Sequence, residues 1–124
     1  MSIISKEIKL AGHKGNIKLE ALFDSGSTFS CVPPAIAEKL GTVIPAVEPI
    51  ELEIAEKGKK LRVDSKVNLD FWINGYRFSD EFLVVPNLSE EAIIGAKTLQ
   101  AWRIKLDFEN DDLIIDPKAA RLRL

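Results

Sequence analysis

Apolar and polar residues alternate along most of this chain, with the period of two that is typical of strands with one buried face. The alternation is clearest over residues 17–23 and 67–73. The second run ends at Asn74-Gly75, a dipeptide that favours a tight hairpin because both turn positions need positive φ. We therefore predict a hairpin whose returning strand covers residues 76–85. A further alternation at 104–108, followed by a polar turn and an apolar run at 113–115, predicts another hairpin.

Two short helices are predicted. One extends from about Pro34 to Leu40, with proline at its start and Gly41 at its end. The other covers about Ala96 to Trp102, directly after a glycine. Many short strands and few helices favour an all-β fold, either a closed barrel or a sandwich. The 124 residues fit a single domain, 1–124, without a linker or internal boundary.

Composition narrows the class of protein. Hydrophobic residues make up 46% of the chain and charged residues 29%, the usual balance of a globular domain. The net charge of −2 gives no electrostatic reason to expect nucleic acid or an anionic membrane as partner. The sequence shows neither a signal peptide nor an apolar stretch of membrane-spanning length. Together with the lone cysteine, these features predict a cytoplasmic protein.

A cysteine nucleophile and a metal site are two candidates that the sequence supports only weakly. Cys31 is the single cysteine and needs a base to act as a nucleophile, but the one histidine, His13, lies in a glycine-rich turn. A small, buried, apolar cysteine is the simpler interpretation. The second candidate is an acidic group without EF-hand spacing, more typical of a solvated hairpin turn. It comprises Asp107, Asp111, Asp112 and Asp116. We therefore predict no metal and no cofactor.

The segment ALFDSGSTFSCVP, residues 21–33, is the strongest candidate for chemistry. An apolar strand leads directly into Asp24, and a carboxylate in that place is costly unless something receives it. The small residues Ser25, Gly26, Ser27 and Thr28 follow and offer hydroxyl groups and an unobstructed backbone. Asp24 could simply cap a turn, as Asp-Ser-Gly often does. Later in the chain, Ile93-Ile94-Gly95 repeats the plan of a strand, a glycine and a short helix.

With the strand before Asp24, the Ser-Thr tract after it and EAIIGAKTL some seventy residues later, the chain resembles the retropepsin-like aspartic peptidases. That family has an apolar strand leading into Asp-Thr/Ser-Gly, a short helix, a flap hairpin, two apolar residues with glycine, and a second helix. The matching parts extend over roughly residues 15 to 116. The resemblance implies a retropepsin-like β-barrel that acts as a homodimer.

The resemblance also implies a mechanism. One aspartate cannot serve as both acid and base, whereas two carboxylates in contact share a proton and activate a water. This chain holds one such motif, so Asp24 would meet its counterpart across a twofold axis. In the family, the residue in the place of Ser25 hydrogen-bonds across that axis. Gly26 would contact substrate backbone, and Ser27 and Thr28 would lie beside the dyad. Ile93, Ile94 and Gly95 would support it.

A flap is expected at 51–63, where alternating residues surround a charged tip. The tip residues are Ala55, Glu56, Lys57, Gly58 and Lys59. An ordinary exposed hairpin would give the same pattern, and this tip departs from the glycine-rich flaps of retroviral enzymes. The leading interpretation is an endopeptidase that cleaves extended peptides. The alternative is a catalytically weak or inactive dimerisation or peptide-binding module, and a third is an unrelated structural β-protein.

Overall fold

The computed structural model describes residues 3–54 and 58–124. More than half of that part is β-strand, and its two helices have seven residues each. The elements follow in the order β1 (Ile3–Gly12), β2 (Gly15–Asp24), β3 (Cys31–Val32), α1 (Pro34–Leu40), β4 (Ile44–Glu53), β5 (Lys60–Ile73), β6 (Tyr76–Val84), β7 (Ala92–Gly95), α2 (Ala96–Trp102), β8 (Lys105–Asp107) and β9 (Asp112–Ile114). Both helices have the bounds predicted from the sequence. No helix within these described ranges is long and apolar enough to cross a membrane.

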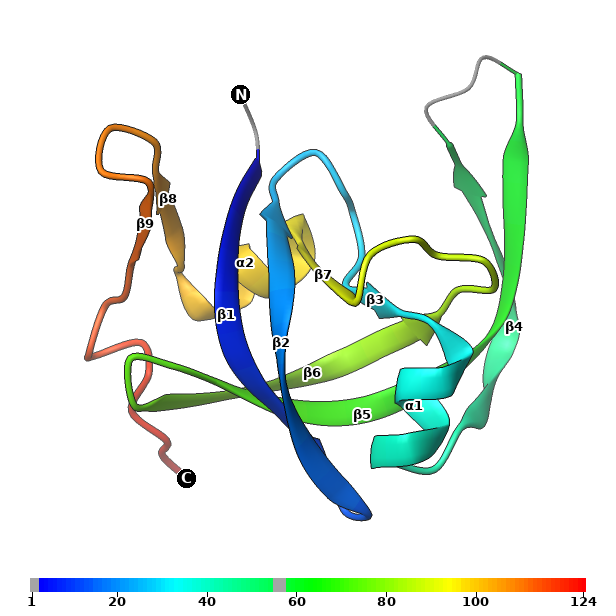
Figure 1. Cartoon of the computed structure of the whole chain (residues 1–124), viewed down its shortest axis with the longest axis horizontal. Coiled ribbons are helices and arrows are strands. Elements are labelled where there is room, and N and C mark those ends of the chain that lie inside the picture. Colours follow the sequence, from blue (N-terminus) through cyan, green and yellow to red (C-terminus); the bar gives the residue numbers. More distant parts are fainter. Residues whose placement is uncertain (1–2, 55–57) are drawn as a thin grey trace.

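Six strands close into a barrel (Figure 1). The hydrogen-bonded order is β1-β2-β7-β3-β6-β5, and β5 pairs again with β1 through Asp70 to Trp72. Closure pairs β1 with β5 and leaves β4 as an appended edge strand on β5. The closed barrel therefore confirms the all-β prediction.

The barrel interior is filled by the residues that alternate in the sequence. Phe23, Phe71, Phe78 and Phe82 are all fully buried. The ring of Phe71 stacks on Phe78 at a centroid distance of 5.4 Å and meets Phe82 edge-on at 6.1 Å. Burial of such large side chains provides the main stabilisation of a domain of this size.

The hairpin turn at Asn74-Gly75 is confirmed. Both residues have positive φ, 51° and 83°, and β5 and β6 pair from Ile73 with Tyr76 onward. The hairpin at the C-terminal end is shorter than predicted, because β8 ends at Asp107 and leaves Phe108 half-exposed in the turn.

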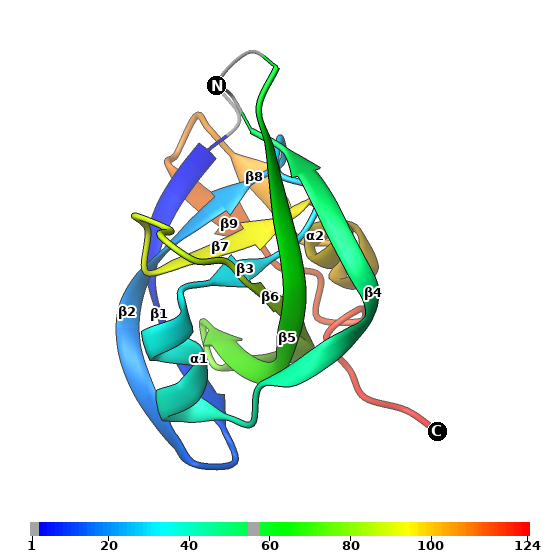
Figure 2. The same cartoon turned by 90° about the vertical axis from the view of Figure 1, so that its right-hand side faces the viewer.

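Another hairpin, β4–β5, rises beyond the barrel at the end where β2 also terminates (Figures 1 and 2). Its strands pair from Ile50 with Val63 to Glu53 with Lys60, so the hairpin expected at 51–63 is present. The register shifts between Pro45 and Ile50, and residues 46–49 bulge away from β5. Residues 55–57, which belong to the predicted tip, lie outside the described ranges.

Candidate active site

Asp24 is the last residue of β2, and it pairs in register with Gly95, the last residue of β7. The two strands are parallel, so both end at the same edge of the sheet. The two similar segments noted in the sequence, 21–26 and 92–96, therefore lie side by side. This pairing places Asp24 at the mouth of the barrel, half-buried, where the chain leaves the sheet.

A tight turn holds the Asp24 carboxylate. The Gly26 N–H donates to Asp24 Oδ1 at 2.8 Å, and the Ser27 N–H donates to the Asp24 carbonyl oxygen at 3.2 Å. The Ser27 hydroxyl donates to the Phe29 carbonyl oxygen at 3.0 Å. Asp24 thus caps its own turn, which fixes the orientation of the carboxylate. Turn capping and a chemical role are compatible at this residue.

Gly95 lets the loop after Asp24 lie directly against α2. A Cβ atom at Gly95 would lie 2.5 Å from the Phe29 carbonyl oxygen and 2.8 Å from that of Ser27. The same loop accepts the first N–H groups of α2, from Ala96 to Ser27 at 2.6 Å and from Lys97 to Thr28 at 3.1 Å. A helix start with no side-chain cap is thereby satisfied by loop carbonyls.

A chain of buried polar groups fixes this junction from within the protein. The Gly95 N–H donates to Ser30 Oγ at 3.0 Å, Ser30 Oγ lies 2.6 Å from Thr98 Oγ1, and Thr98 donates to Asp80 Oδ2 at 2.6 Å. An ionised carboxylate can only accept, so Thr98 donates to Asp80 and Ser30 donates to Thr98. Ser30 and Thr98 are the two polar residues that are buried among those described.

A cleft of about 550 Å³ lies between the loop after Asp24 and strand β4. Its lining comprises Gly26, Ser27, Thr28, Phe29, Cys31, Glu51, Leu52 and Glu53. Three of the four residues predicted to support the dyad therefore lie in one cavity beneath the hairpin. Ser25 lines a different cavity, on the α2 and β8 side.

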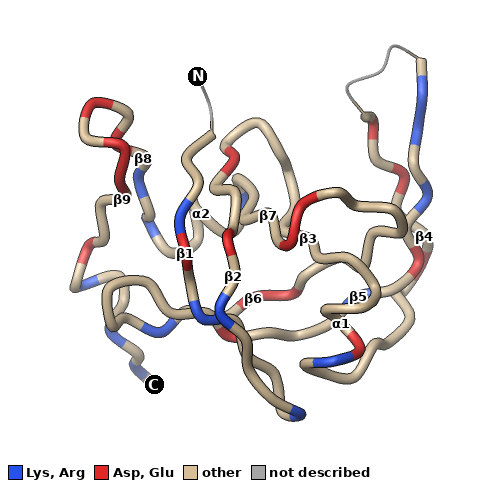
Figure 3. The backbone as a smooth tube through the Cα atoms, in the orientation of Figure 1, with Lys and Arg blue, Asp and Glu red and all other residues tan. Residues whose placement is uncertain are grey.

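Charges on the hairpin are arranged by strand, with acids on β4 and bases on the opposing part of β5 (Figure 3). Glu51 and Glu53 stand opposite Arg62 and Lys60 in the register. The Lys60 ammonium lies 3.9 Å from the Glu51 carboxylate, and both side chains are mostly exposed. Exposed pairs of this kind stabilise little, so the charges favour the pairing of the two strands without fixing it.

The other predicted residues divide between core and surface. Ile94 is buried in the barrel core, whereas the half-buried Ile93 packs with Cys31 in a smaller apolar cluster under the hairpin. Gly58 has φ of 77°, a conformation that favours glycine, and Lys59 is exposed. Ala55, Glu56 and Lys57 lie outside the described residues.

Three of the acidic residues near the C-terminal end have partners within the protein. Asp107 accepts hydrogen bonds from the backbone and side chain of Asn110. The Lys6 ammonium lies 2.5 Å from Asp112, and this hydrogen bond lowers the pKa of the exposed Asp112 carboxyl. Asp116 accepts from the Lys118 N–H. The contacts of Asp107 and Asp116 are those of ordinary turns, whereas the Lys6–Asp112 pair joins β1 to β9.

Sequence reasoning missed Asp80, Ser30 and Thr98. Ser30 and Thr98 are separated by 68 positions, and neither differs in the sequence from an exposed serine or threonine. The sequence did hold one signal that Ser30 is buried. Ser30 lies two residues before Val32, on an apolar segment where an exposed polar residue is not expected. The partner residues could not be inferred from that signal alone.

Cys31 is buried, and burial raises the pKa of its thiol from 9.0 to about 11, with smaller effects of the Glu90 and Asp24 carboxylates. We expect alkylation by iodoacetamide at pH 8 to be at least about a hundredfold slower than for free cysteine. Because the unfolded thiol ionises near pH 9 and the folded one does not, the free energy of unfolding should fall between pH 9 and 11. The measurement is chemical denaturation of wild type and Cys31→Ala across that range. An identical pH dependence in the two proteins would contradict a raised pKa of the Cys31 thiol.

Comparison with known proteins identifies the architecture. No protein-family model matches the chain. The crystal structure of the retroviral protease-like domain of Ddi1 from Leishmania major superposes with a TM-score of 0.68 at 17% identity, covering 94% of this chain and 90% of that one. The solution structure of the simian foamy virus (mac) protease gives a TM-score of 0.48 at 20% identity, covering 77% and 92%. The barrel, its two short helices and its projecting hairpin are therefore a retropepsin-like fold.

Proposed function

We propose that this protein is an aspartic endopeptidase whose site forms when two copies bring their Asp24 carboxylates together. The observation that carries the proposal is the position of Asp24, which ends β2 at the mouth of a retropepsin-like barrel, in register with Gly95 and beside a cleft. A single carboxylate cannot act on water and on the peptide at once. The chain has one Asp-Ser-Gly motif, so the second carboxylate must come from another copy.

The chemistry follows from two carboxylates in contact. Their mutual repulsion keeps one protonated while the other stays ionised. The ionised carboxylate removes a proton from a water, and that water attacks the scissile carbonyl carbon. The protonated carboxylate donates to the developing oxyanion, and a proton then passes to the leaving amine. The Gly26 N–H bond to Asp24 Oδ1 supports this mechanism because it holds one carboxylate in a fixed orientation.

The surface around Ser25 supports association of two copies. A groove of about 830 Å³, which we call the interface groove, has mainly apolar walls. Its apolar lining includes Leu99, Ile104, Leu106, Phe108 and Ile114. Phe108 and Ile114 are 47% and 50% exposed, an unfavourable state for large apolar side chains unless another surface covers them. A second copy placed here would bring its own Ser25, and with it Asp24, to the same axis.

The substrate is proposed to be an extended peptide bound beneath the β4–β5 hairpin. Strand β4 is the outermost strand of the sheet, so one side of its backbone can pair with another strand. Its residues Glu51 to Glu53 line the cleft opposite the loop after Asp24. A peptide added to β4 would therefore pass over the catalytic carboxylates with its backbone hydrogen-bonded.

The proposal is tested by counting inhibitor sites. A statine-containing peptide carries a hydroxyl that mimics the tetrahedral intermediate, and a shared dyad offers one site per two chains. We expect isothermal titration calorimetry to give a stoichiometry near 0.5 per chain, with sedimentation velocity showing a dimer in the complex. Peptide cleavage by the same preparation should stop once one inhibitor has been added for every two chains. Binding of one inhibitor per chain, or a monomer that cleaves peptides, would contradict the shared site.

A further inference from the structure

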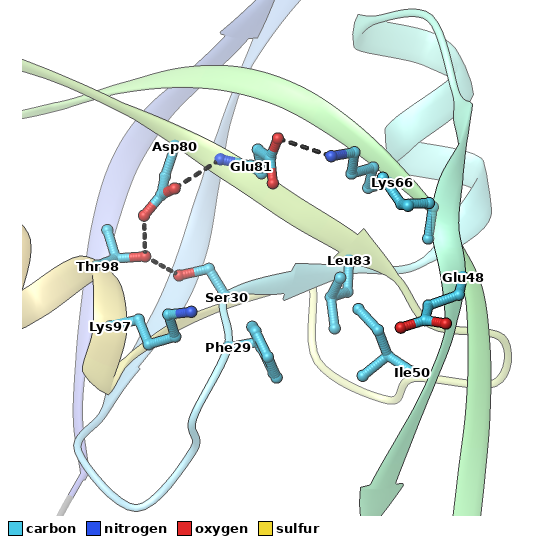
Figure 4. Close-up of a pocket in the computed structure, with 12 residues that line it drawn as sticks. Phe29, Ser30, Glu48, Ile50, Lys66, Asp80, Glu81, Leu83, Lys97 and Thr98 are labelled. Carbon is cyan, nitrogen blue, oxygen red and sulfur yellow. Dashed lines mark hydrogen bonds and ion pairs between the residues drawn. The ribbon is translucent and has the colours of Figure 1, made fainter.

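A second cavity, of about 300 Å³, shares Phe29 with the cleft as a lining residue. Figure 4 shows Ile50 extending from β4 toward Leu83 and Phe29, so that the floor is apolar. Ala46 and Val47, from the bulged part of β4, complete the apolar lining. We call this cavity the outer pocket.

The polar groups on its walls are largely occupied with one another (Figure 4). Asp80 accepts from Thr98 through one oxygen and from the Glu81 N–H, at 2.7 Å, through the other. The Lys66 ammonium lies 2.8 Å from the Glu81 carboxylate. These bonds engage both oxygens of Asp80 and pair the charges of Lys66 and Glu81, so the apolar floor is the part of the pocket best suited to a ligand side chain. The hydrogen-bonded wall also makes the pocket preformed.

The outer pocket continues the cleft along one strand. Residues 51–53 of β4 line the cleft, residues 46–48 and Ile50 line the outer pocket, and Phe29 borders both. From Leu52 to Glu48 is four residues, or about 13 Å in an extended strand. A peptide that pairs with the free side of β4 would reach both cavities in one extended conformation.

We propose that the outer pocket holds a large apolar side chain of the peptide substrate, about four residues along the peptide from the part that lies in the cleft. The proposal rests on the proposed function and defines its substrate class further. In a twofold dimer each copy supplies one outer pocket, so an apolar residue is selected on both sides of the scissile bond. Lys97 and Glu48 add one charge of each sign to the lining, which gives a charged side chain of either sign no net advantage.

Peptide binding tests this without requiring cleavage. The probes are fluorescein-labelled decapeptides that share one central sequence and carry either leucine or serine at one outer position at a time. The Asp24→Asn protein is titrated into each peptide, and binding is followed by fluorescence anisotropy. Leucine should bind about ten- to a hundredfold more tightly than serine at one outer position on each side. Equal affinity at every outer position would overturn the proposal.

Filling the pocket provides the matched variant. In the Asp24→Asn background, Ala46→Phe should abolish the preference for leucine over serine at the outer positions. Ala46→Leu should weaken it partly, and Ala35→Phe, on the exposed face of α1, should leave it intact. A preference that survives Ala46→Phe would overturn the proposal. If wild type cleaves none of these peptides but the binding preference responds to Ala46→Phe, the outer pocket stands and the proposed peptidase activity fails.

Discussion

Replacing Asp24 with asparagine is expected to lower kcat for peptide cleavage by at least about a thousandfold. An amide can neither take a proton from water at neutral pH nor donate one as an acid. In a dimer of identical chains, the substitution removes both carboxylates at once. The turn should persist, because the asparagine side-chain oxygen can still accept the hydrogen bond from the Gly26 N–H. The measurement is steady-state cleavage of a peptide selected from a library by the wild-type protein.

A charge-matched control separates chemistry from general electrostatics. Glu38→Gln removes one carboxylate from the exposed face of α1 and should leave kcat within about twofold of wild type. Sedimentation velocity should show the same association for wild type, Asp24→Asn and Glu38→Gln. Cleavage that persists in Asp24→Asn would exclude the dyad mechanism. If wild type cleaves no peptide at acidic to neutral pH but binds peptides as a dimer, the protein is a peptide-binding module of the same fold.

Local signals in the sequence were sufficient to predict several elements of the fold. The helix at Pro34–Leu40 begins at a proline and ends before Gly41, and the turn at Asn74-Gly75 needs positive φ at both residues. Each feature depends on a few adjacent residues. The prediction of a closed or sandwiched β-fold followed from the number of short strands, and the resemblance around Asp24 selected the retropepsin-like barrel.

Features set by distant contacts could not be predicted in the same way. Closure of the barrel depends on Lys9 to Ala11 meeting Asp70 to Trp72, a register that neither segment encodes alone. The outer pocket depends on a bulge in β4, which appears only once β4 is aligned against β5. Polar residues such as Asp80 and Thr98 acquire their role from a fold that brings separate segments together.

Gly95→Ala should lower the free energy of unfolding by about 2–4 kcal/mol. The added Cβ would lie 2.5 Å from the Phe29 carbonyl oxygen and 2.6 Å from its carbonyl carbon, and both are backbone atoms that cannot rotate away. Relief of the clash requires the loop after Asp24 to move away from β7 and α2. That movement strains the hydrogen bonds that the Ser27 and Thr28 carbonyls accept from the α2 N–H groups. Chemical denaturation gives the free energy directly.

Gly15→Ala is the matched control, because a Cβ there meets nothing within 4 Å and the substitution is chemically identical. It should change the free energy of unfolding by no more than about 0.5 kcal/mol. At temperatures where Gly95→Ala is still folded, its kcat should nevertheless be at least about a hundredfold below that of Gly15→Ala, because a displacement of about 1 Å at a catalytic group has an effect of that order. A stable Gly95→Ala protein with normal kcat would mean that the loop carrying Asp24 is not positioned by its contact with β7. The catalytic geometry would then have to be set by the partner subunit instead.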